Sequence, residues 1–94
     1  MALEQSSIEH SSNELGGRFY IDNAAQMSYR WDGVNVMVVD HTTVDRELRG
    51  QGLAERLYHH MVGFARDNQI RVVPVCSYIV SMFERHPEDA AVLG

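Results

Sequence analysis

The clearest chemical signal in the sequence is a run of glycines and one arginine ahead of an amphipathic segment. Arg49-Gly50-Gln51-Gly52 precedes a stretch with helical periodicity that extends to Asn68. The first turn of a helix presents unpaired N–H groups and a partial positive charge. Glycine leaves room for an anion to approach those groups, Arg49 adds donors suited to phosphate oxygens, and Ala54 is small. The run therefore predicts a site for a phosphate or pyrophosphate.

Two common nucleotide-binding motifs are absent. The sequence has no Gly-x-Gly-x-x-Gly run with an acidic residue ending the next strand, which disfavours a dinucleotide-binding fold. It also has no Gly-Lys-Ser/Thr, which excludes a Walker loop. The phosphate site must therefore belong to another class of protein.

Composition excludes several further partners. The net charge is −5 and all eight basic residues are arginines, so the surface repels a nucleic-acid backbone and we expect no nucleic-acid partner. No apolar run approaches the roughly 20 residues needed to cross a bilayer, so we expect no membrane partner. The single cysteine, Cys76, cannot form an internal disulfide. These features favour an intracellular, cytoplasmic protein, with the nucleus as the alternative.

The histidines do not form an evident metal site. None makes a recognisable ligand pair with a carboxylate at metal spacing. His59 and His60 are adjacent, so on a helix they point about a quarter turn apart. We expect no metal.

Three strands and a helix are expected to position the phosphate site. Strands are predicted over residues 18–21, 26–31 and 34–40, with Asp32-Gly33 as a two-residue hairpin turn before the third. In the strand over 26–31, Met27, Tyr29 and Trp31 share one face, and we expect that face to pack in the core. The third strand is nearly continuous in valine and methionine, which predicts a central strand covered on both faces.

The remaining elements complete one small domain. A strand is predicted over 70–76, interrupted by Pro74, which cannot donate to a ladder. A second helix is expected from Ser77 as its N-cap to Arg85, where His86-Pro87 stops it and the histidine bonds back to the backbone. Residues 1–17 are expected to be a flexible leader, with a short edge strand near Ile8 as an alternative, and residues 18–94 a single domain. The predicted class is α/β (α+β): a mixed sheet of an antiparallel meander plus one parallel strand, with two helices.

The motif resembles the coenzyme A signature of the GNAT acetyltransferases, Gln/Arg-x-x-Gly-x-Gly/Ala. It stands here as Arg49-Gly50-Gln51-Gly52-Leu53-Ala54. Residues 41–44, Pro74–Tyr78 and His86–Glu88 extend the resemblance to short members of that superfamily, over roughly residues 19–88. The resemblance implies a minimal GNAT-like fold with acetyl-CoA or coenzyme A as cofactor.

The resemblance also implies how the coenzyme would lie. The coenzyme would enter where two parallel strands, 36–42 and 71–76, splay apart. Its pantetheine amides would pair with the backbone near Met37–Asp40. A backbone N–H near Val38 or Val39 would stabilise the oxyanion. The coenzyme-binding residues expected on this basis are Val38, Val39, Thr42, Val44, Arg49, Gly50, Gln51, Gly52, Leu53 and Ala54.

Three residues are candidates for catalysis. Asp40 and His41, at the end of the central strand, could deprotonate an amine, although a loop or capping hydrogen bond by His41 is the alternative. Cys76 precedes a helix near the expected thioester and could relay the acetyl group or merely line the site as a small apolar residue. Many GNAT enzymes have Asn and Tyr where this chain has Cys76 and Phe83, so the usual proton donor is missing. Tyr78 could replace it only if it points toward the sulfur.

Three functions remain open at this level. The first is acetyl transfer from acetyl-CoA to an amine, with a basic protein or peptide among the acceptors that an acidic chain would favour. The second is a non-catalytic module that binds or senses acyl-CoA. The third is a structural domain in which Arg49–Gly52 binds another phosphate. Larger GNAT enzymes have N-terminal helices that wall the acceptor groove, and we expect no room for such helices between Arg18 and Val34. We expect a monomer or weak dimer.

Overall fold

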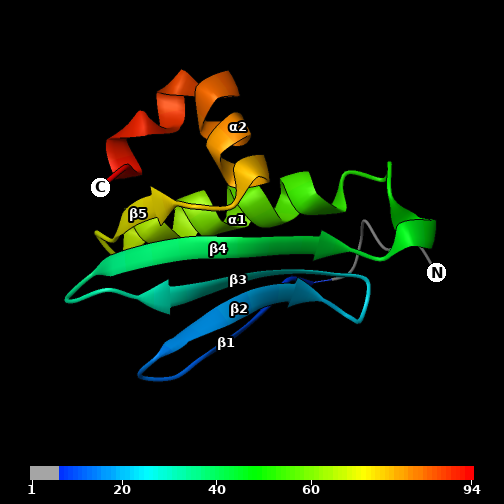
Figure 1. Ribbon diagram of the computed structural model, residues 1–94, viewed down its shortest axis with the longest axis horizontal. Coiled ribbons are helices and arrows are strands. Elements are labelled where there is room, and N and C mark those ends of the chain that lie inside the picture. The colour runs from blue at the N-terminus through cyan, green and yellow to red at the C-terminus, as the bar shows by residue number, and fades with distance from the viewer. Residues whose placement is uncertain (1–6) are drawn as a thin grey trace.

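The computed structural model describes residues 7–94, which form one five-stranded sheet with helices on one face (Figure 1). In chain order the elements are β1 (Glu9–Ser12), β2 (Gly16–Ile21), β3 (Ala25–Trp31), β4 (Val36–Val44), the 3₁₀ helix η2 (Arg46–Leu48), α1 (Leu53–Asp67), β5 (Arg71–Pro74), α2 (Ser77–Arg85) and the 3₁₀ helix η3 (Pro87–Val92). The sheet order is β1-β2-β3-β4-β5; the first four strands are antiparallel and β5 is parallel to β4. The predicted class, with its meander, one parallel strand and two α-helices, is confirmed.

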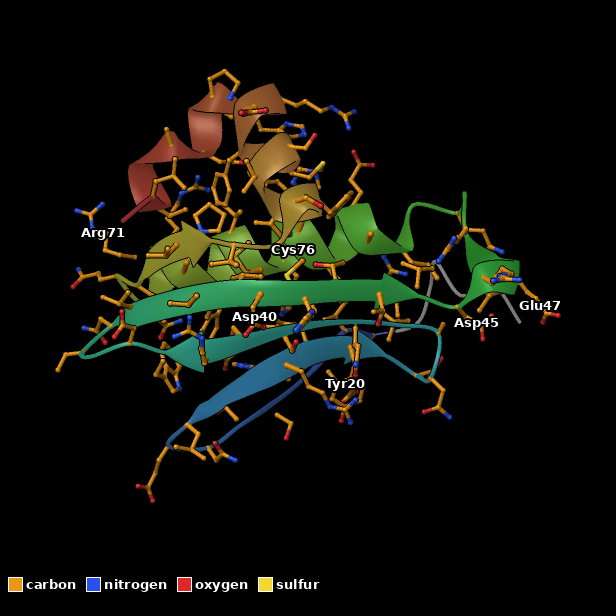
Figure 2. The ribbon with its side chains drawn as sticks, viewed as in Figure 1. Tyr20, Asp40, Asp45, Glu47, Arg71 and Cys76 are labelled. Carbon is orange, nitrogen blue, oxygen red and sulfur yellow. The ribbon has the colours of Figure 1, made fainter. Side chains whose placement is uncertain are left out.

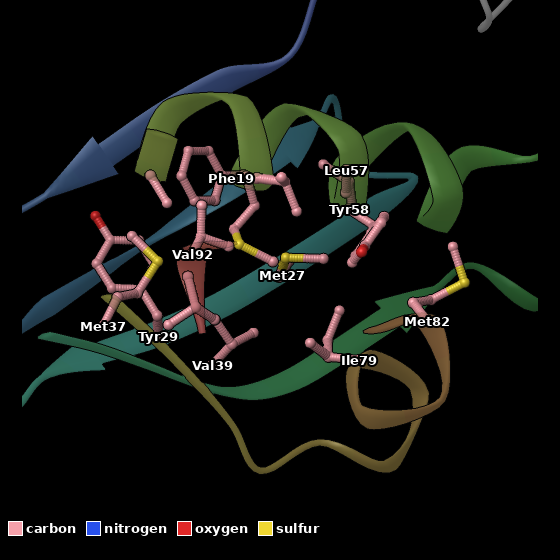
Figure 3. Packing of buried hydrophobic residues seen from close by; sticks show 14 of the residues in the cluster. Phe19, Met27, Tyr29, Met37, Val39, Leu57, Tyr58, Ile79, Met82 and Val92 are labelled. Carbon is pink, nitrogen blue, oxygen red and sulfur yellow. The ribbon is translucent and has the colours of Figure 1, made fainter. Parts of the chain in front are cut away.

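One core holds the sheet and helices together (Figure 3). Met27 and Tyr29 of β3 are buried on the face that meets Leu57 and Met61 of α1. Helix α2 adds Met82 to the same cluster. The alternating pattern of β3 and the helical periodicity of α1 therefore bury complementary faces, as expected for a sheet covered by amphipathic helices.

Strand β4 lies between β3 and β5 in the sheet. Met37, Val38 and Val39 are consecutive and all buried, but the helices within residues 7–94 cover only one face of the sheet (Figure 1), so the predicted covering of both faces is wrong. Val38 pairs with Arg30 and Val73 on the other face. The strand runs to Val44, beyond the predicted end at Asp40. Its start differs as well, because the connection from β3 spans four residues. Gly33 and Asn35 have positive φ, and the Asp32 N–H donates to the Val36 carbonyl at 2.9 Å.

The predicted two-residue turn at Asp32-Gly33 is therefore wrong. The left-handed positions fall on Gly33 and Asn35, so the loop is longer and Val34 lies in it, almost fully exposed. Because Val34 lies before β4 begins, its side chain does not pack against the neighbouring strand. The valine run consequently overstated the strand by two residues.

The N-terminal part of the sheet starts earlier than predicted. β1 pairs with β2 from Glu9↔Tyr20 to Ser12↔Gly17, so part of the expected flexible leader is an edge strand. His10 explains the order of this segment: its Nε2 lies 2.6 Å from the Tyr29 hydroxyl and its ring stacks on Phe19 at 4.2 Å. Residues 1–6 of the expected leader lie outside the described residues.

The C-terminal elements show two smaller corrections. Cys76, rather than Ser77, is the N-cap residue of α2. The His86 ring faces the Glu88 carboxylate, with Nδ1 3.2 Å from Oε2, instead of bonding back to the backbone. After Pro87 the chain continues as η3, which packs on α1: the Tyr58 hydroxyl donates to Asp89 Oδ2 at 2.7 Å.

None of the helices within residues 7–94 has the length and apolar character that crossing a membrane requires.

Candidate functional site

The predicted phosphate-binding run forms the wall of a cavity of about 470 Å³. The cavity lies between the end of β4, the loop after η2, the first turn of α1 and one face of α2. Seven of the ten residues expected to bind a coenzyme line it: Thr42, Val44, Arg49, Gly50, Gly52, Leu53 and Ala54. The run and the end of the central strand therefore meet at one site.

The local backbone explains why glycine occupies positions 50 and 52. Gly50 has φ +88° and Gly52 has φ +77°, conformations that L side chains rarely adopt. Gly52 is the N-cap of α1 and provides no side-chain cap. No other heavy atom lies within 4 Å of where a Cβ would stand at either glycine, so the loop surface is open. The first N–H groups of a 15-residue helix consequently face the cavity without a side chain in front of them.

Helix α2 contributes Met82 and Arg85, which the sequence did not assign to the site, and Tyr78, which was expected there only if it pointed toward the sulfur. Tyr78, Met82 and Arg85 line the cavity, at i, i+4 and i+7 on one helix face. That spacing was available in the sequence, but only the packing of α2 shows which face meets α1. Arg85 brings a second guanidinium to the cavity beside Arg49. Two arginines and one carboxylate, Glu55, line the cavity, so its wall has a net positive charge that favours an anionic ligand.

The two parallel strands part at the inner end of this site. The β4–β5 ladder runs from Val36↔Arg71 to Val39↔Pro74 and stops there. The Val39 carbonyl accepts from the N–H groups of Val75, at 2.9 Å, and Cys76, at 3.1 Å. Beyond Val39, β4 continues without β5 as its neighbour, while the chain after Pro74 turns into α2 (Figure 1). Because Pro74 has no N–H to extend the ladder, the gap opens at this point.

Val38 and Val39, two of the expected coenzyme-binding residues, are placed differently from the expectation. Both are paired with β5 and buried, and neither lines the cavity. The backbone left without a β5 partner begins at Asp40, because the ladder persists up to Pro74. Gln51 also lies outside the cavity wall, exposed at the surface.

A β-bulge in β4 determines where the candidate bases point. Ser28 pairs with His41 and Tyr29 with Val39, so Asp40 is the extra residue. Its carboxylate lies 3.4 Å from the Ser28 hydroxyl, which donates to it, and 3.8 Å from Arg30 Nε. Met27 and Tyr29 face the core, so Ser28 and Arg30 lie on the other face of the sheet. Asp40 and His41 therefore lie on the face that no helix covers within residues 7–94.

Cys76 lies on the other side of the gap from these bases. Its thiol donates to Thr42 Oγ1 at 3.6 Å, and Thr42 lines the cavity. Figure 2 shows Cys76 and Asp40 beside β4 where β5 leaves it. Cys76 is half-buried and caps the N-terminus of α2. The three predicted catalytic residues thus lie on different faces of the sheet, with Cys76 in contact with the cavity wall and Asp40 and His41 on the open face beside β3.

Two aromatic residues of α2, Phe83 and Tyr78, differ in whether they can supply a proton at the site. Phe83 is buried in the core, with its ring centroid 5.3 Å from that of Tyr58, so it supplies no polar group to the cavity. Tyr78 lines the cavity and is half-buried. Burial, followed by the negative charge of Glu55, raises the pKa of Tyr78 above its usual value. Tyr78 is therefore held as a neutral phenol, which can donate a proton.

Residues 18–92 match the family model of the GCN5-related N-acetyl-transferases. The chain belongs to this family. The motif at Arg49–Ala54, the parting strands and the fold are thereby explained together, and the minimal GNAT-like fold expected from the sequence is confirmed.

A solved relative agrees with this assignment. The chain is similar to the solution NMR structure of a GCN5-like candidate N-acetyltransferase from Staphylococcus aureus, with 32% sequence identity and a TM-score of 0.72. The alignment covers 92% of this chain and 87% of that one. No curated protein matches the sequence.

Proposed function

We propose that this GCN5-related domain binds acetyl-CoA and transfers its acetyl group to an amine, such as one on a basic protein or peptide. The observation that carries the proposal is the position of the Arg49–Ala54 motif. It lines a cavity whose wall includes Thr42, and Thr42 contacts the thiol of Cys76, which follows the last β4–β5 pair. The proposed phosphate site, the β4 backbone that would pair with the pantetheine arm and the candidate nucleophile Cys76 would then follow one another along the bound coenzyme.

The coenzyme phosphates are assigned to the outer part of the cavity. The N–H groups at the start of α1 and the guanidinium groups of Arg49 and Arg85 would neutralise the pyrophosphate. The pantetheine arm would run inward and pair with the backbone of β4 beyond Val39, which lacks a β5 partner. A backbone N–H of this segment would stabilise the oxyanion, a role worth about 3 kcal/mol in other enzymes.

Direct transfer needs a base on the acceptor side. An aliphatic amine has a pKa of about 10 and must lose a proton before it attacks. Asp40 and His41 lie on the uncovered face of the sheet, so an amine approaching from that face would meet them before the thioester. When the amine nitrogen bonds to the acetyl carbon, the carbon–sulfur bond of acetyl-CoA breaks. Tyr78 would supply the proton to the departing coenzyme thiolate.

A relay through Cys76 is the alternative chemical route. Its thiolate would attack the acetyl carbon and form an acetyl-cysteine thioester as the bond to the coenzyme sulfur breaks, and Tyr78 would protonate the departing coenzyme thiolate. The amine would then attack this thioester, yielding the acetylated amine and regenerating the Cys76 thiol. The half-buried position of Cys76, whose thiol contacts Thr42 in the cavity wall, supports this route.

A module that binds acyl-CoA without turnover is the second candidate function. It is favoured by the burial of Phe83, which replaces the usual proton donor of the superfamily with a core residue. It predicts tight binding of acetyl-CoA with no acetylated amine produced.

Calorimetric titration with acetyl-CoA tests the coenzyme site. Gly52→Glu would place a carboxylate at the phosphate site, and we expect it to abolish the micromolar binding of the unmodified chain. Gly33→Glu is a matched control, because Gly33 also has positive φ and open space at Cβ but lies in the β3–β4 loop. Equal loss in both variants, or absence of binding to the unmodified chain, would contradict the proposal.

Intact-mass analysis after incubation with acetyl-CoA distinguishes the two chemical routes. The chain contains no lysine, so an acetyl adduct cannot reside on a lysine side chain. The relay predicts one hydroxylamine-sensitive acetyl group on the unmodified chain and none on Cys76→Ser. An adduct that persists in Cys76→Ser, with an unchanged transfer rate, would exclude the relay. Product analysis with a panel of amines separates both routes from the binding module.

A further inference from the structure

Three metal-ligating side chains meet at the junction of α1 and the end of α2. Glu55 and His59 are one helical turn apart on α1, and His86 follows the last residue of α2. Each offers a ligand atom, and these atoms lie within 4.8 Å of one another. The expectation of no metal rested on two observations, that no histidine forms a recognisable ligand pair with a carboxylate and that His59 and His60 point apart, and it overlooked the pair of Glu55 and His59. The spacing of Glu55 and His59 was visible in the sequence, but their approach to His86 depends on the packing of two helices.

The His86 ring is the most informative member of this group. Its Nδ1 lies 3.2 Å from Glu88 Oε2. Its Nε2 is buried and has no hydrogen-bond partner among the described residues. The Tyr58 ring stacks beside it at 5.6 Å and the His59 ring lies edge-on at 5.4 Å, so the imidazole is held in place by its neighbours. Buried polar atoms are normally satisfied, and a nitrogen with no partner is available to an ion.

The set of donors matches a known class of metal site. Two imidazoles and one carboxylate form the three-ligand arrangement of open zinc sites, which leave a fourth position to water or another ligand. The Glu88 carboxylate on the far nitrogen of His86 matches the carboxylate–histidine–metal arrangement that fixes a ligating ring. Glu55 and His59 are exposed, so their side chains can rotate onto an ion without disturbing the core.

A second group, His86, Glu88 and Asp89, shares the same histidine. Its Asp89 accepts the Tyr58 hydroxyl at 2.7 Å and lies 3.4 Å from Arg66 Nη2, so both carboxylate oxygens are already engaged. This group is a weaker ligand set. Glu88 serves the first group better as the partner of Nδ1.

We propose that Glu55, His59 and the Nε2 atom of His86 bind one divalent transition-metal ion, of which Zn²⁺ is the best fit. Glu88 is a positioning residue that orients the His86 ring. The net charge of −5 adds a general attraction for a cation. Glu55 also lines the proposed coenzyme cavity, whereas His59 and His86 do not, so the metal site is tested without coenzyme.

The test uses chain without a polyhistidine tag, stripped of metal with a chelator. Calorimetry with Zn²⁺ and visible absorption with Co²⁺ measure affinity, stoichiometry and coordination. We expect one ion per chain and Co²⁺ bands typical of mixed nitrogen and oxygen ligands. Glu88→Gln should weaken binding by about 10-fold, as outer-shell changes do, and His59→Ala or Glu55→Gln by at least as much.

His60→Ala is the matched control. His60 is also exposed and lies next to His59 on α1, but it is not part of the group and contacts Phe19 instead. Its loss should leave the affinity for Zn²⁺ unchanged. Because His59 and Glu55 are exposed, their variants should keep the unfolding midpoint of the unmodified chain in the absence of metal. Absence of binding, or equal affinity in His59→Ala and the unmodified chain, would overturn the proposal.

Discussion

The Tyr58–Asp89 hydrogen bond should be a main support of the C-terminal segment. The Tyr58 hydroxyl donates to Asp89 Oδ2 at 2.7 Å, and both residues are buried. Hydrogen bonds to charged groups contribute about 1.5–3 kcal/mol, and Tyr58→Phe would also leave a buried carboxylate with only the longer contact to Arg66. We therefore expect a loss of about 2 kcal/mol. For a domain of this size, 1 kcal/mol shifts Tm by about 4–8 °C, which predicts a decrease of about 8–16 °C.

Thermal unfolding followed by circular dichroism measures this effect, with Tyr20→Phe as the control. Tyr20 is half-buried on the uncovered face of the sheet, and its contact with Arg18 uses the ring, so its hydroxyl should matter little. A decrease of less than about 2 °C for Tyr58→Phe would refute the reasoning, because the hydrogen bond would then contribute almost nothing to stability.

The same pair predicts a dependence on alkaline pH. Burial, followed by the hydrogen bond to Asp89 and its charge, raises the pKa of Tyr58 far above its usual value. A raised pKa in the folded state means that the contribution to stability is complete below the unfolded value of about 10 and is lost as pH rises above it. The difference in unfolding free energy between the unmodified chain and Tyr58→Phe should therefore shrink above pH 10. A constant difference from pH 8 to pH 11 would contradict this.

Three further predictions concern the edge strand, two glycines and the proton donor. Burial, followed by the charge of His60, lowers the pKa of His10. The contribution of His10 to stability should therefore be present above pH 6.5 and lost as pH falls below it. Urea unfolding at pH 7 and pH 5 should show this dependence, and the variant His10→Phe should lack it. Gly16→Ala should lower the free energy of unfolding by about 1–3 kcal/mol, because the new Cβ would collide with the Tyr29 carbonyl. Gly63→Ala, which has open space on a helix, should raise it by about 0.5–1 kcal/mol in the same assay. Tyr78→Phe should lower kcat for acetyl transfer about 100-fold with little change in KM for acetyl-CoA, and equal kcat values would remove Tyr78 as the proton donor.

Much of the fold could be predicted because each signal was local. The helix from Leu53 to Asp67 and the stop at His86-Pro87 follow from periodicity and from the backbone restrictions of proline. The parallel β4–β5 pair was expected from the order strand, helix, strand. The errors were also local: Val34 continued an apolar run but lies in a turn, and Cys76, rather than the neighbouring serine, caps α2.

The part of the candidate site that one continuous segment forms, Arg49–Ala54, could be expected from the sequence. Arg49–Ala54 carries its own backbone geometry, with glycines where φ is positive, and so it could be identified from residue types alone. The cavity opposite it could not be predicted, because Tyr78 and Arg85 reach it only through the packing of α2. Which face of a helix meets a neighbour depends on the whole core rather than on the helix itself.

The sequence by itself thus determined most of the elements, their order and the run Arg49–Ala54, since these depend on periodicity, glycine and proline over a few residues. Only the tertiary structure decided how residues distant in the chain come together. The bulge that turns Asp40 and His41 to the open face arises from the register between β3 and β4. The contact of Cys76 with Thr42 and the meeting of His86 with α1 arise in the same way, from the packing of elements against one another. Register and packing are set by the fit of side chains across elements, which no local pattern records.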